Sequence, residues 1–227
     1  RSALVLYDQL VQMIDEYEQH LLEQIEALQP KKRRGSQIPC HPNATKQKDL
    51  RRRGEQPMRE ALWRLCGEDL TRIDGISSAA ALTVLTEVGA DLSAFPDEHH
   101  FVSWPRLSPK MAFSAGKALK KRRNGLGASR VAAVLRMCAL TLQKTSTALG
   151  ACYRRTARRK SGKLAVFAVA RKLAILIYRM LRYGQDYVDI GAKCYEARFA
   201  QRRMRSLKAS AQSLGYKLVP LDEPAAA

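Results

Sequence analysis

The sequence predicts an all-α protein with an N-terminal coiled-coil helix, a basic linker and a multi-helix domain. Over most of the chain, apolar residues recur at the three- and four-residue spacing of amphipathic helices. Aromatic residues make up only 7% of the 227 residues, and glycine and proline number 13 and 9, so the turn formers of an all-β fold are scarce. Hydrophobic residues make up 46%, which is enough for a core and excludes wholesale disorder.

Residues 1–29 are expected to form a single acidic helix that contains no glycine or proline before residue 30. Two apolar seams follow a seven-residue repeat, with Tyr7, Ile14, Leu21 and Leu28 in one and Leu10 and Tyr17 in the other. This register predicts a coiled coil, through which the chain forms a homo-oligomer or pairs with a partner helix. An ordinary amphipathic helix that packs on its own domain is the alternative.

Residues 30–56 are predicted to be a basic, flexible linker. Pro30, Pro39 and Pro42 interrupt a stretch that holds many lysines and arginines and offers almost nothing apolar to bury. Either this linker becomes ordered on nucleic acid or it only keeps the chain in solution.

Residues 57–190 form the main domain, and residues 191–227 form a basic C-terminal helix and tail. Pro57 suits the first turn of a helix, and Gly75 suits the turn between two helices. The expected helices run from Pro57 to about Leu70–Arg72, from a cap at Ser77 or Ser78 to about Gly89, from the Asp97 cap to Trp104, from Ala128 to Ser146, from Gly162 to Tyr183 and from Ala192 to Leu214. Residues 110–125 are expected to be a basic loop that contains glycine.

The charge pattern predicts a nucleic-acid partner. The formal net charge is +19, and no acidic residue occurs between Glu98 and Asp186, a segment that holds 20 of the 40 lysines and arginines. A general polyanion or a ribosomal contact is the alternative. The cations expected to contact DNA or RNA are Lys117, Lys120, Lys121, Arg122, Arg123, Arg130, Arg154, Arg155, Arg158, Arg159, Arg171 and Lys172.

Several other classes of protein are excluded by spacing. The most apolar stretch, Leu164 to Leu181, contains three cations, so no membrane partner is expected. The cysteines number five and have no CxxC spacing, which argues against structural zinc and a disulfide framework and fits a reducing cytoplasm. The acid-free half has no carboxylates for a magnesium site, so no cofactor is expected in this chain and any metal must come from elsewhere.

The turn Ile73-Asp74-Gly75-Ile76-Ser77 resembles the helix-hairpin-helix of DNA-repair and recombination proteins. In such a turn, the free amide groups and the dipole at the start of the second helix bind a DNA phosphate without reading sequence, which makes Gly75 and Ser77 candidate DNA-binding residues. Asp74 would disfavour a phosphate unless its carboxylate points away. A plain turn between two helices is the alternative.

Ser114-Ala115-Gly116-Lys117 is the most interesting loop for chemistry. A serine beside small residues and a run of cations suits attack on a phosphodiester, because the cations hold the phosphate and offset charge in the transition state.

Residues 57–216 resemble the C-terminal domain of the insertion-sequence one-hundred-and-ten type transposases, which are guided by a bridge RNA. Each motif is short, but the order of the motifs is specific. The matching residues are Leu70 to Gly89, Phe95-Pro96, Ser103-Trp104, Pro109, Ser114, Gly116-Lys117, Asn124, Ala128 to Arg136, Leu149-Gly150, Tyr153 to Arg155, Ala170 to Leu173, Ile177-Tyr178, Met180-Leu181, Gly184 and Tyr187.

The resemblance implies a recombinase whose Ser114 attacks DNA and forms a covalent phosphoserine link, with Gly116 in the nucleophile loop. It further implies a magnesium-binding RuvC-like domain before residues 1–28, a guide RNA, a synaptic homo-oligomer and a location at the bacterial nucleoid in the cytoplasm. Without that metal-binding domain, we expect the chain to be inactive.

Two departures from the family pattern lie beside this chemistry. Arg106 and Ala115 stand where the family commonly has glycine. If position 106 has a positive φ, its side chain costs about 1 kcal/mol of strain. A decayed copy that binds nucleic acid without cleaving it therefore remains the alternative to an active recombinase.

Overall fold

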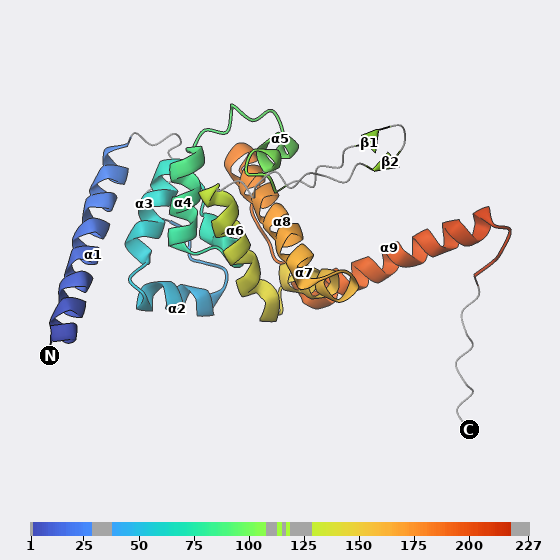
Figure 1. Ribbon diagram of the computed structural model, residues 1–227, viewed down its shortest axis with the longest axis horizontal. Coiled ribbons are helices and arrows are strands. Elements are labelled where there is room, and N and C mark those ends of the chain that lie inside the picture. Colours follow the sequence, from blue (N-terminus) through green and yellow to red (C-terminus); the bar gives the residue numbers. More distant parts are fainter. Residues whose placement is uncertain (1, 29–37, 108–112, 115–116, 119–128, 219–227) are drawn as a thin grey trace, which may run out of the picture.

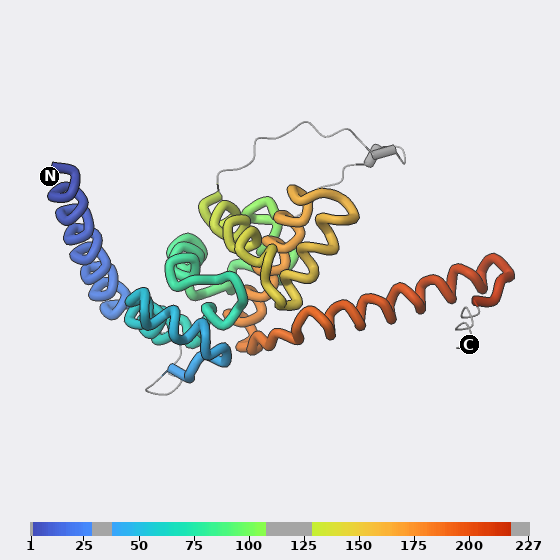
Figure 2. The backbone as a smooth tube through the Cα atoms, turned by 90° about the horizontal axis from the view of Figure 1, so that it is seen from below, coloured from blue at the N-terminus to red at the C-terminus, as the bar shows by residue number. Residues whose placement is uncertain are grey.

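A computed structural model describes residues 2–28, 38–107, 113–114, 117–118 and 129–218 of the chain. Helices α3 to α8 form the body, while α1 and α9 lie at opposite ends of the molecule (Figures 1 and 2). The described α-helices are α1 (Ser2–Ala27), α2 (Ala44–Arg52), α3 (Gln56–Cys66), α4 (Ser78–Val88), α5 (Glu98–Ser103), α6 (Arg130–Thr141), α7 (Ala148–Arg159), α8 (Gly162–Tyr183) and α9 (Gly191–Ser213).

The predicted all-α class is confirmed for the described residues apart from one very short hairpin. Its strands are β1 (Phe113–Ser114) and β2 (Lys117–Ala118), which pair antiparallel. The expected loop over residues 110–125 therefore contains a hairpin of two residues a side. Strands this short carry too little sequence pattern to be recognised.

The core is built around α8, which packs against α5, α6 and α7. One face of α8 is buried along its whole length, and the buried residues are Ala165, Val169, Ala170, Leu173, Ala174, Ile177, Tyr178 and Met180. The Tyr178 hydroxyl donates to the Phe95 carbonyl at 2.9 Å, so burial of this ring leaves its polar atom satisfied. The predicted bounds of α8 are confirmed.

Residues 38–56 are not the flexible linker that the sequence predicts. This segment contains α2, which buries Leu50, and it is fixed to the body by polar contacts. Arg59 in α3 donates to the Pro39 carbonyl at 3.0 Å, and Lys46 in α2 donates to the Ile73 carbonyl at 3.1 Å. Lys46, one of the basic side chains that suggested solvation, instead donates to backbone carbonyl oxygens of the body.

A buried ion pair holds this region together. Arg59 donates from Nη2 and Nε to Asp69 Oδ2 at 2.6 and 3.1 Å, and both side chains are at least nine-tenths buried. Asp69 also accepts from the backbone amide of Thr71, at 3.1 Å, at the start of the 3₁₀ turn Leu70–Arg72. The Asp69 carboxylate thus joins α3 to the turn that leads to α4, and the Arg59 guanidinium also binds the segment before α2 through the Pro39 carbonyl.

The turn between α3 and α4 differs from the predicted one. α3 ends at Cys66, where Gly67 adopts the left-handed conformation, and residues 70–72 form only one 3₁₀ turn. The expectation that a helix extends to Leu70–Arg72 is therefore wrong. The cap at Ser77, which accepts from the Ala80 amide, is confirmed.

Helix α1 is confirmed, but its predicted seams face solvent. It packs on α3 mainly through Leu22 and Ile25, beside an exposed pair between Glu26 and Arg64 at 2.9 Å. The seam residues Tyr7, Ile14 and Leu21 remain exposed.

Helix α7 is not among the helices expected from the sequence, and its first turn contains Gly150, a residue with low helix propensity. That glycine is required by the fold, since a Cβ there would lie 2.5 Å from the Thr145 carbonyl oxygen.

We find no helix in the described ranges that is long and apolar enough to cross a membrane.

The buried pair leads to a prediction about stability. Arg59→Met leaves the Asp69 carboxylate buried without its cation, and we expect it to lower the free energy of unfolding by about 3 kcal/mol. Chemical denaturation monitored by circular dichroism measures this. Arg52→Met is the control, because Arg52 pairs with Asp49 in solvent, and its effect is expected to stay below about 0.5 kcal/mol. Equal losses in the two variants would contradict the role of the buried pair.

Candidate nucleic-acid interface

The hairpin brings the candidate nucleophile opposite a candidate phosphate-binding cation. In the register of β1 and β2, Ser114 pairs with Lys117 and Phe113 pairs with Ala118. The backbones of Ser114 and Lys117 are therefore direct cross-strand neighbours. Gly116 and the cations Lys120, Lys121, Arg122 and Arg123 lie outside the described residues.

The start of α4, where a phosphate contact is expected, is occupied by a carboxylate of the same chain. Glu55 Oε2 accepts from the Ser78 amide at 3.2 Å, and the Ser77 hydroxyl accepts from the Ala80 amide at 3.2 Å. A carboxylate at this position interacts favourably with the helix dipole, as a phosphate would. Gly75 and Ser77 therefore shape a helix start at which the Ser78 and Ala80 amides already have partners inside the chain.

Gly75 is needed for packing as well as for its backbone angle. Its φ is +85°, and a Cβ there would come within 3.0 Å of the Cys138 carbonyl oxygen in α6 and of the Leu142 side chain. The turn thus lies directly on the C-terminal half of α6, so part of it faces the protein interior.

Asp74 points toward the body of the protein. The Tyr187 hydroxyl donates to Asp74 Oδ2 at 2.9 Å, and nearby Arg72 pairs with Asp186 at 2.7 Å. Burial raises the pKa of the Asp74 carboxyl, while the hydrogen bond from Tyr187 and the charge of Lys46 partly offset this. The side chain that would disfavour a phosphate is therefore used to hold residues 186–187 against the turn.

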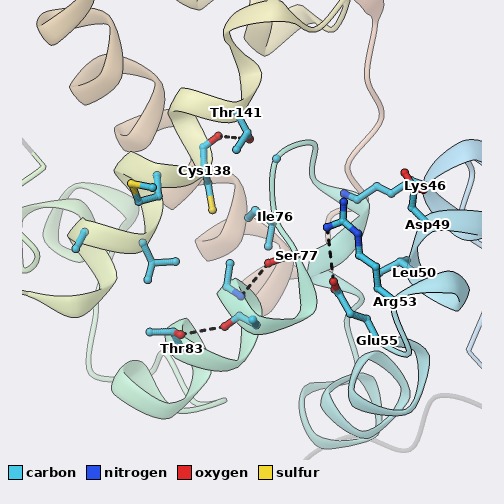
Figure 3. Close-up of a pocket in the computed structure, with 16 residues that line it drawn as sticks. Lys46, Asp49, Leu50, Arg53, Glu55, Ile76, Ser77, Thr83, Cys138 and Thr141 are labelled. Atoms are coloured by element: carbon cyan, nitrogen blue, oxygen red, sulfur yellow. Dashed lines mark hydrogen bonds and ion pairs between the residues drawn. The ribbon is translucent and has the colours of Figure 1, made fainter. Parts of the chain in front are cut away.

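A cavity of about 700 Å³ lies between α2, the start of α4 and α6. Figure 3 shows Lys46 and Arg53 on the α2 side, Ser77 and Thr83 on α4, and Cys138 on α6. Its two cations are already used, because Lys46 binds the carbonyls of Thr71 and Ile73 and Arg53 lies 3.9 Å from Glu55. Most of the exposed lining is apolar, which is unlike a groove that binds phosphates.

Arg155, which the sequence predicts to contact nucleic acid, lies against two aromatic rings of α9. Its guanidinium carbon lies 3.6 Å from the ring centroid of Phe199 and 4.6 Å from that of Tyr195. It also donates to the Tyr195 hydroxyl. Tyr195 and Phe199 are four residues apart on α9, so they present neighbouring rings to α7.

Lys172 belongs to the same cluster. Its Nζ donates to Cys152 Sγ at 3.0 Å and lies 5.5 Å from the centroid of the Tyr195 ring. Burial alone would raise the pKa of the Cys152 thiol, but the hydrogen bond from Tyr195 and the charges of Lys172 and Arg155 lower it overall.

The remaining predicted cations divide into partnered and open ones. Arg154 donates to the carbonyls of Thr145 and Gln143, Arg130 lies 3.5 Å from Glu87, and Arg171 lies 3.4 Å from His99. Arg158 and Arg159, in the last turn of α7, are exposed. Of the predicted cations with described side chains, these two are the most available to an external phosphate.

The sequence did not predict that Glu55 binds the start of α4 or that Tyr195 and Phe199 contact Arg155. Glu55 lies 23 positions before Ser78, so no local pattern links the two residues. The four-residue spacing of Tyr195 and Phe199 did indicate a shared face of α9, but gave no sign that an arginine would lie between the rings.

Glu55 provides a prediction about α4. Glu55→Ala removes an acceptor and a favourable charge at the start of this helix, and we expect the free energy of unfolding to fall by about 1 kcal/mol. Glu87→Ala, in the last turn of the same helix, removes a charge that the dipole disfavours and is expected to change stability by less than about 0.5 kcal/mol. Urea denaturation of both variants tests this; a neutral Glu55→Ala would show that Glu55 does not stabilise α4.

Arg155 provides a second prediction. Arg155→Met removes the cation between the two rings of α9, and we expect the backbone amides of residues 192–200 to exchange with solvent roughly tenfold faster. Hydrogen–deuterium exchange followed by mass spectrometry measures this, with Arg158→Met as the control that leaves exchange unchanged. If amide exchange stays unchanged in Arg155→Met while DNA binding weakens, Arg155 contacts nucleic acid and does not anchor α9.

Comparison with known proteins gives one family model that matches part of the chain. Residues 67–154 match the family model described as Transposase IS116/IS110/IS902 family. This span contains the turn at Gly75, the hairpin with Ser114 and helices α4 to α6, and it ends within α7. No curated protein and no solved structure matches the chain.

Proposed function

We propose, from the premise that residues 67–154 are a transposase domain of the IS116/IS110/IS902 family, that this chain binds DNA and supplies Ser114 as the nucleophile of strand cleavage and joining. The family domain itself implies DNA transposition. The identity of the nucleophile is the finer part of the proposal, and it is supported by the hairpin that contains Ser114.

The observation that carries the proposal is the pairing of Ser114 with Lys117 inside the family-matched span. The backbone pairing supports this proposal because it makes a serine and a lysine cross-strand neighbours, and a cation near the nucleophile would offset the negative charge that a phosphate gains during attack. The surrounding segment from residue 99 to residue 185 contains no carboxylate that would repel the DNA backbone.

The reaction that we assign is a transesterification. The Ser114 oxygen forms a bond to phosphorus, the ester bond between that phosphorus and one deoxyribose oxygen breaks, and the released strand end takes up a proton as a hydroxyl. Attack by a new strand end on the phosphoserine reverses these steps and joins DNA. The ester keeps its bond energy in the covalent link, so joining needs no external energy source.

Magnesium does not fit the described residues of this chain. Within the described ranges, no group of three or more His, Cys, Asp or Glu lies close enough to hold a metal ion. We therefore derive no step through magnesium, and its supply by a separate RuvC-like domain stays a prediction.

Self-association and a guide RNA complete the proposal. The exposed seam of α1, with Tyr7, Ile14 and Leu21, supports pairing with a second copy, because apolar side chains in a seven-residue repeat gain from mutual burial. The guide RNA and a location at the bacterial nucleoid follow from the family resemblance alone.

One observation favours a second candidate function, DNA binding without cleavage. Arg106 has a φ of 59°, as expected if a glycine-adapted conformation is retained at this position. It is the sole non-glycine residue with positive φ in the described ranges, and the strain costs about 1 kcal/mol. It lies two residues after Trp104, in the turn that leads toward the hairpin, so an altered turn here would affect the approach of DNA to Ser114.

The proposal predicts a covalent protein–DNA adduct. When the chain is joined to the metal-binding domain expected before it, a nicked suicide substrate should trap an adduct in the wild type and none in Ser114→Ala. Ser129→Ala is the control, because that hydroxyl only caps α6. Denaturing electrophoresis detects the adduct, and peptide mapping locates it.

Three other outcomes would each change the assignment of the nucleophile or of the catalytic activity. An adduct that persists in Ser114→Ala would show that Ser114 is not the nucleophile. An adduct that forms only after Arg106→Gly with Ala115→Gly would support the non-catalytic candidate for the natural chain. An adduct that survives in Ser114→Ala and disappears in Ser129→Ala would exchange the roles of the two serines.

A further inference from the structure

Helix α9 leaves the body and extends into solvent. In both views it projects from the region of α7 and α8 to the far end of the molecule (Figures 1 and 2). Its first two turns are attached through Tyr195, Phe199 and a hydrogen bond of 3.0 Å from the Ala192 amide to the Ser146 carbonyl. From Ala200 to Ser213 every residue is exposed except the half-buried Ala211.

The projecting part of α9 carries a basic stripe. Arg198, Arg202, Arg205 and Lys208 follow one another at spacings of four, three and three residues, which places them on one face of the helix. At a rise of about 1.5 Å per residue, this stripe is about 15 Å long. No acidic residue occurs between Glu196 and Asp222 to neutralise it.

Without a bound ligand, repulsion among the cations of the stripe destabilises the projecting part of α9. Like charges three or four residues apart destabilise an isolated helix, and a helix without tertiary packing has little else to stabilise it. A ligand that brings negative charge to this face therefore stabilises the helix while it binds. Charge complementarity thus points to a polyanion.

The α1 and α9 ends of the molecule differ in charge, and this difference indicates the end at which a polyanion binds. Helix α1, at the opposite end, has no lysine or arginine between Ser2 and Ala27, and its acidic residues are Asp8, Asp15, Glu16, Glu18, Glu23 and Glu26. A polyanion is repelled from the α1 end and attracted to the α9 end.

We propose that the stripe of Arg198, Arg202, Arg205 and Lys208 is a binding site for the phosphates of a DNA duplex, which lies along α9. The site extends the DNA-binding surface beyond the family-matched span, and it rests on the proposed function because it assumes a DNA substrate. Duplex DNA is favoured over duplex RNA because the major groove of B-form DNA is about as wide as an α-helix, whereas that of A-form RNA is deep and narrow.

The test is the salt dependence of binding by the full chain. Fluorescence anisotropy with a 30-base-pair DNA duplex is measured between about 50 and 300 mM NaCl for the wild type and for Arg198→Gln, Arg202→Gln, Arg205→Gln, Lys208→Gln combined. Loss of about four phosphate contacts should make the slope of log affinity against log salt shallower by about 3 to 4. Amide exchange of residues 200–213 should also slow on addition of DNA in the wild type.

A matched control removes the same charge from α2 and α3, on the side of the body where α1 lies (Figure 1). Lys48→Gln, Arg51→Gln, Arg52→Gln and Arg64→Gln combined change exposed residues of α2 and α3, and the slope is expected to change by less than about 1. Far-UV circular dichroism verifies that all three proteins are folded.

Each other outcome overturns a specific claim. Equal slopes in the stripe variant and the control would overturn the site on α9 while leaving DNA binding intact. A stripe-dependent slope on duplex RNA at least as steep as on duplex DNA would overturn the choice of DNA. A wild-type slope shallower than about −2 on DNA would overturn the proposed function together with this site.

Discussion

The burial of one face of α8 is the constraint on which the rest of the structure depends. Helices α5, α6 and α7 all pack against this face, and its small residues Ala165, Ala170 and Ala174 let them approach closely. The segment that holds the hairpin leaves the turn after α5 and returns at the start of α6. Both ends of the candidate catalytic segment are therefore fixed to the same central helix, even though its own strands are only two residues long.

Positive charge has two separate uses in this molecule. Arg59, Lys46 and Arg155 are held inside it by a carboxylate, by carbonyl oxygens and by aromatic rings. Arg158, Arg159 and the basic stripe of α9 are left exposed to solvent. Cations are costly to bury without compensating partners, which explains why Arg59 and Lys46 lie beside a carboxylate or backbone carbonyls and Arg155 lies between two aromatic rings. Net charge alone thus overstates the surface that is available to nucleic acid.

Most helices could be predicted from the sequence, because α1, α4, α8 and α9 have uninterrupted apolar periodicity and recognisable ends. Helix α2 could not be predicted, since it is held by hydrogen bonds from Arg59 to Gln47 and from Lys46 to the Ile73 carbonyl, across long sequence separations, rather than by an apolar stripe. Of the candidate site, the motif singled out Ser114 and Lys117, whose backbones pair across the hairpin, and their functional roles stay predictions. The roles of Arg155 and Lys172 could not be predicted, because a single sequence does not show which cations face an aromatic ring or a thiol.

The attachment of α9 has a mechanical consequence. From Tyr195 to Ser213 the helix runs about 27 Å at a rise of about 1.5 Å per residue, with its contacts to the body confined to the first two turns. The helix therefore acts as a rigid arm that pivots where the Arg155 guanidinium contacts its first turns. A rotation of about 10° at this pivot moves the free end by roughly 5 Å, without repacking the core around α8. The protein can therefore adapt to bent DNA through a change at this one attachment of α9, while the rest of its fold stays unchanged.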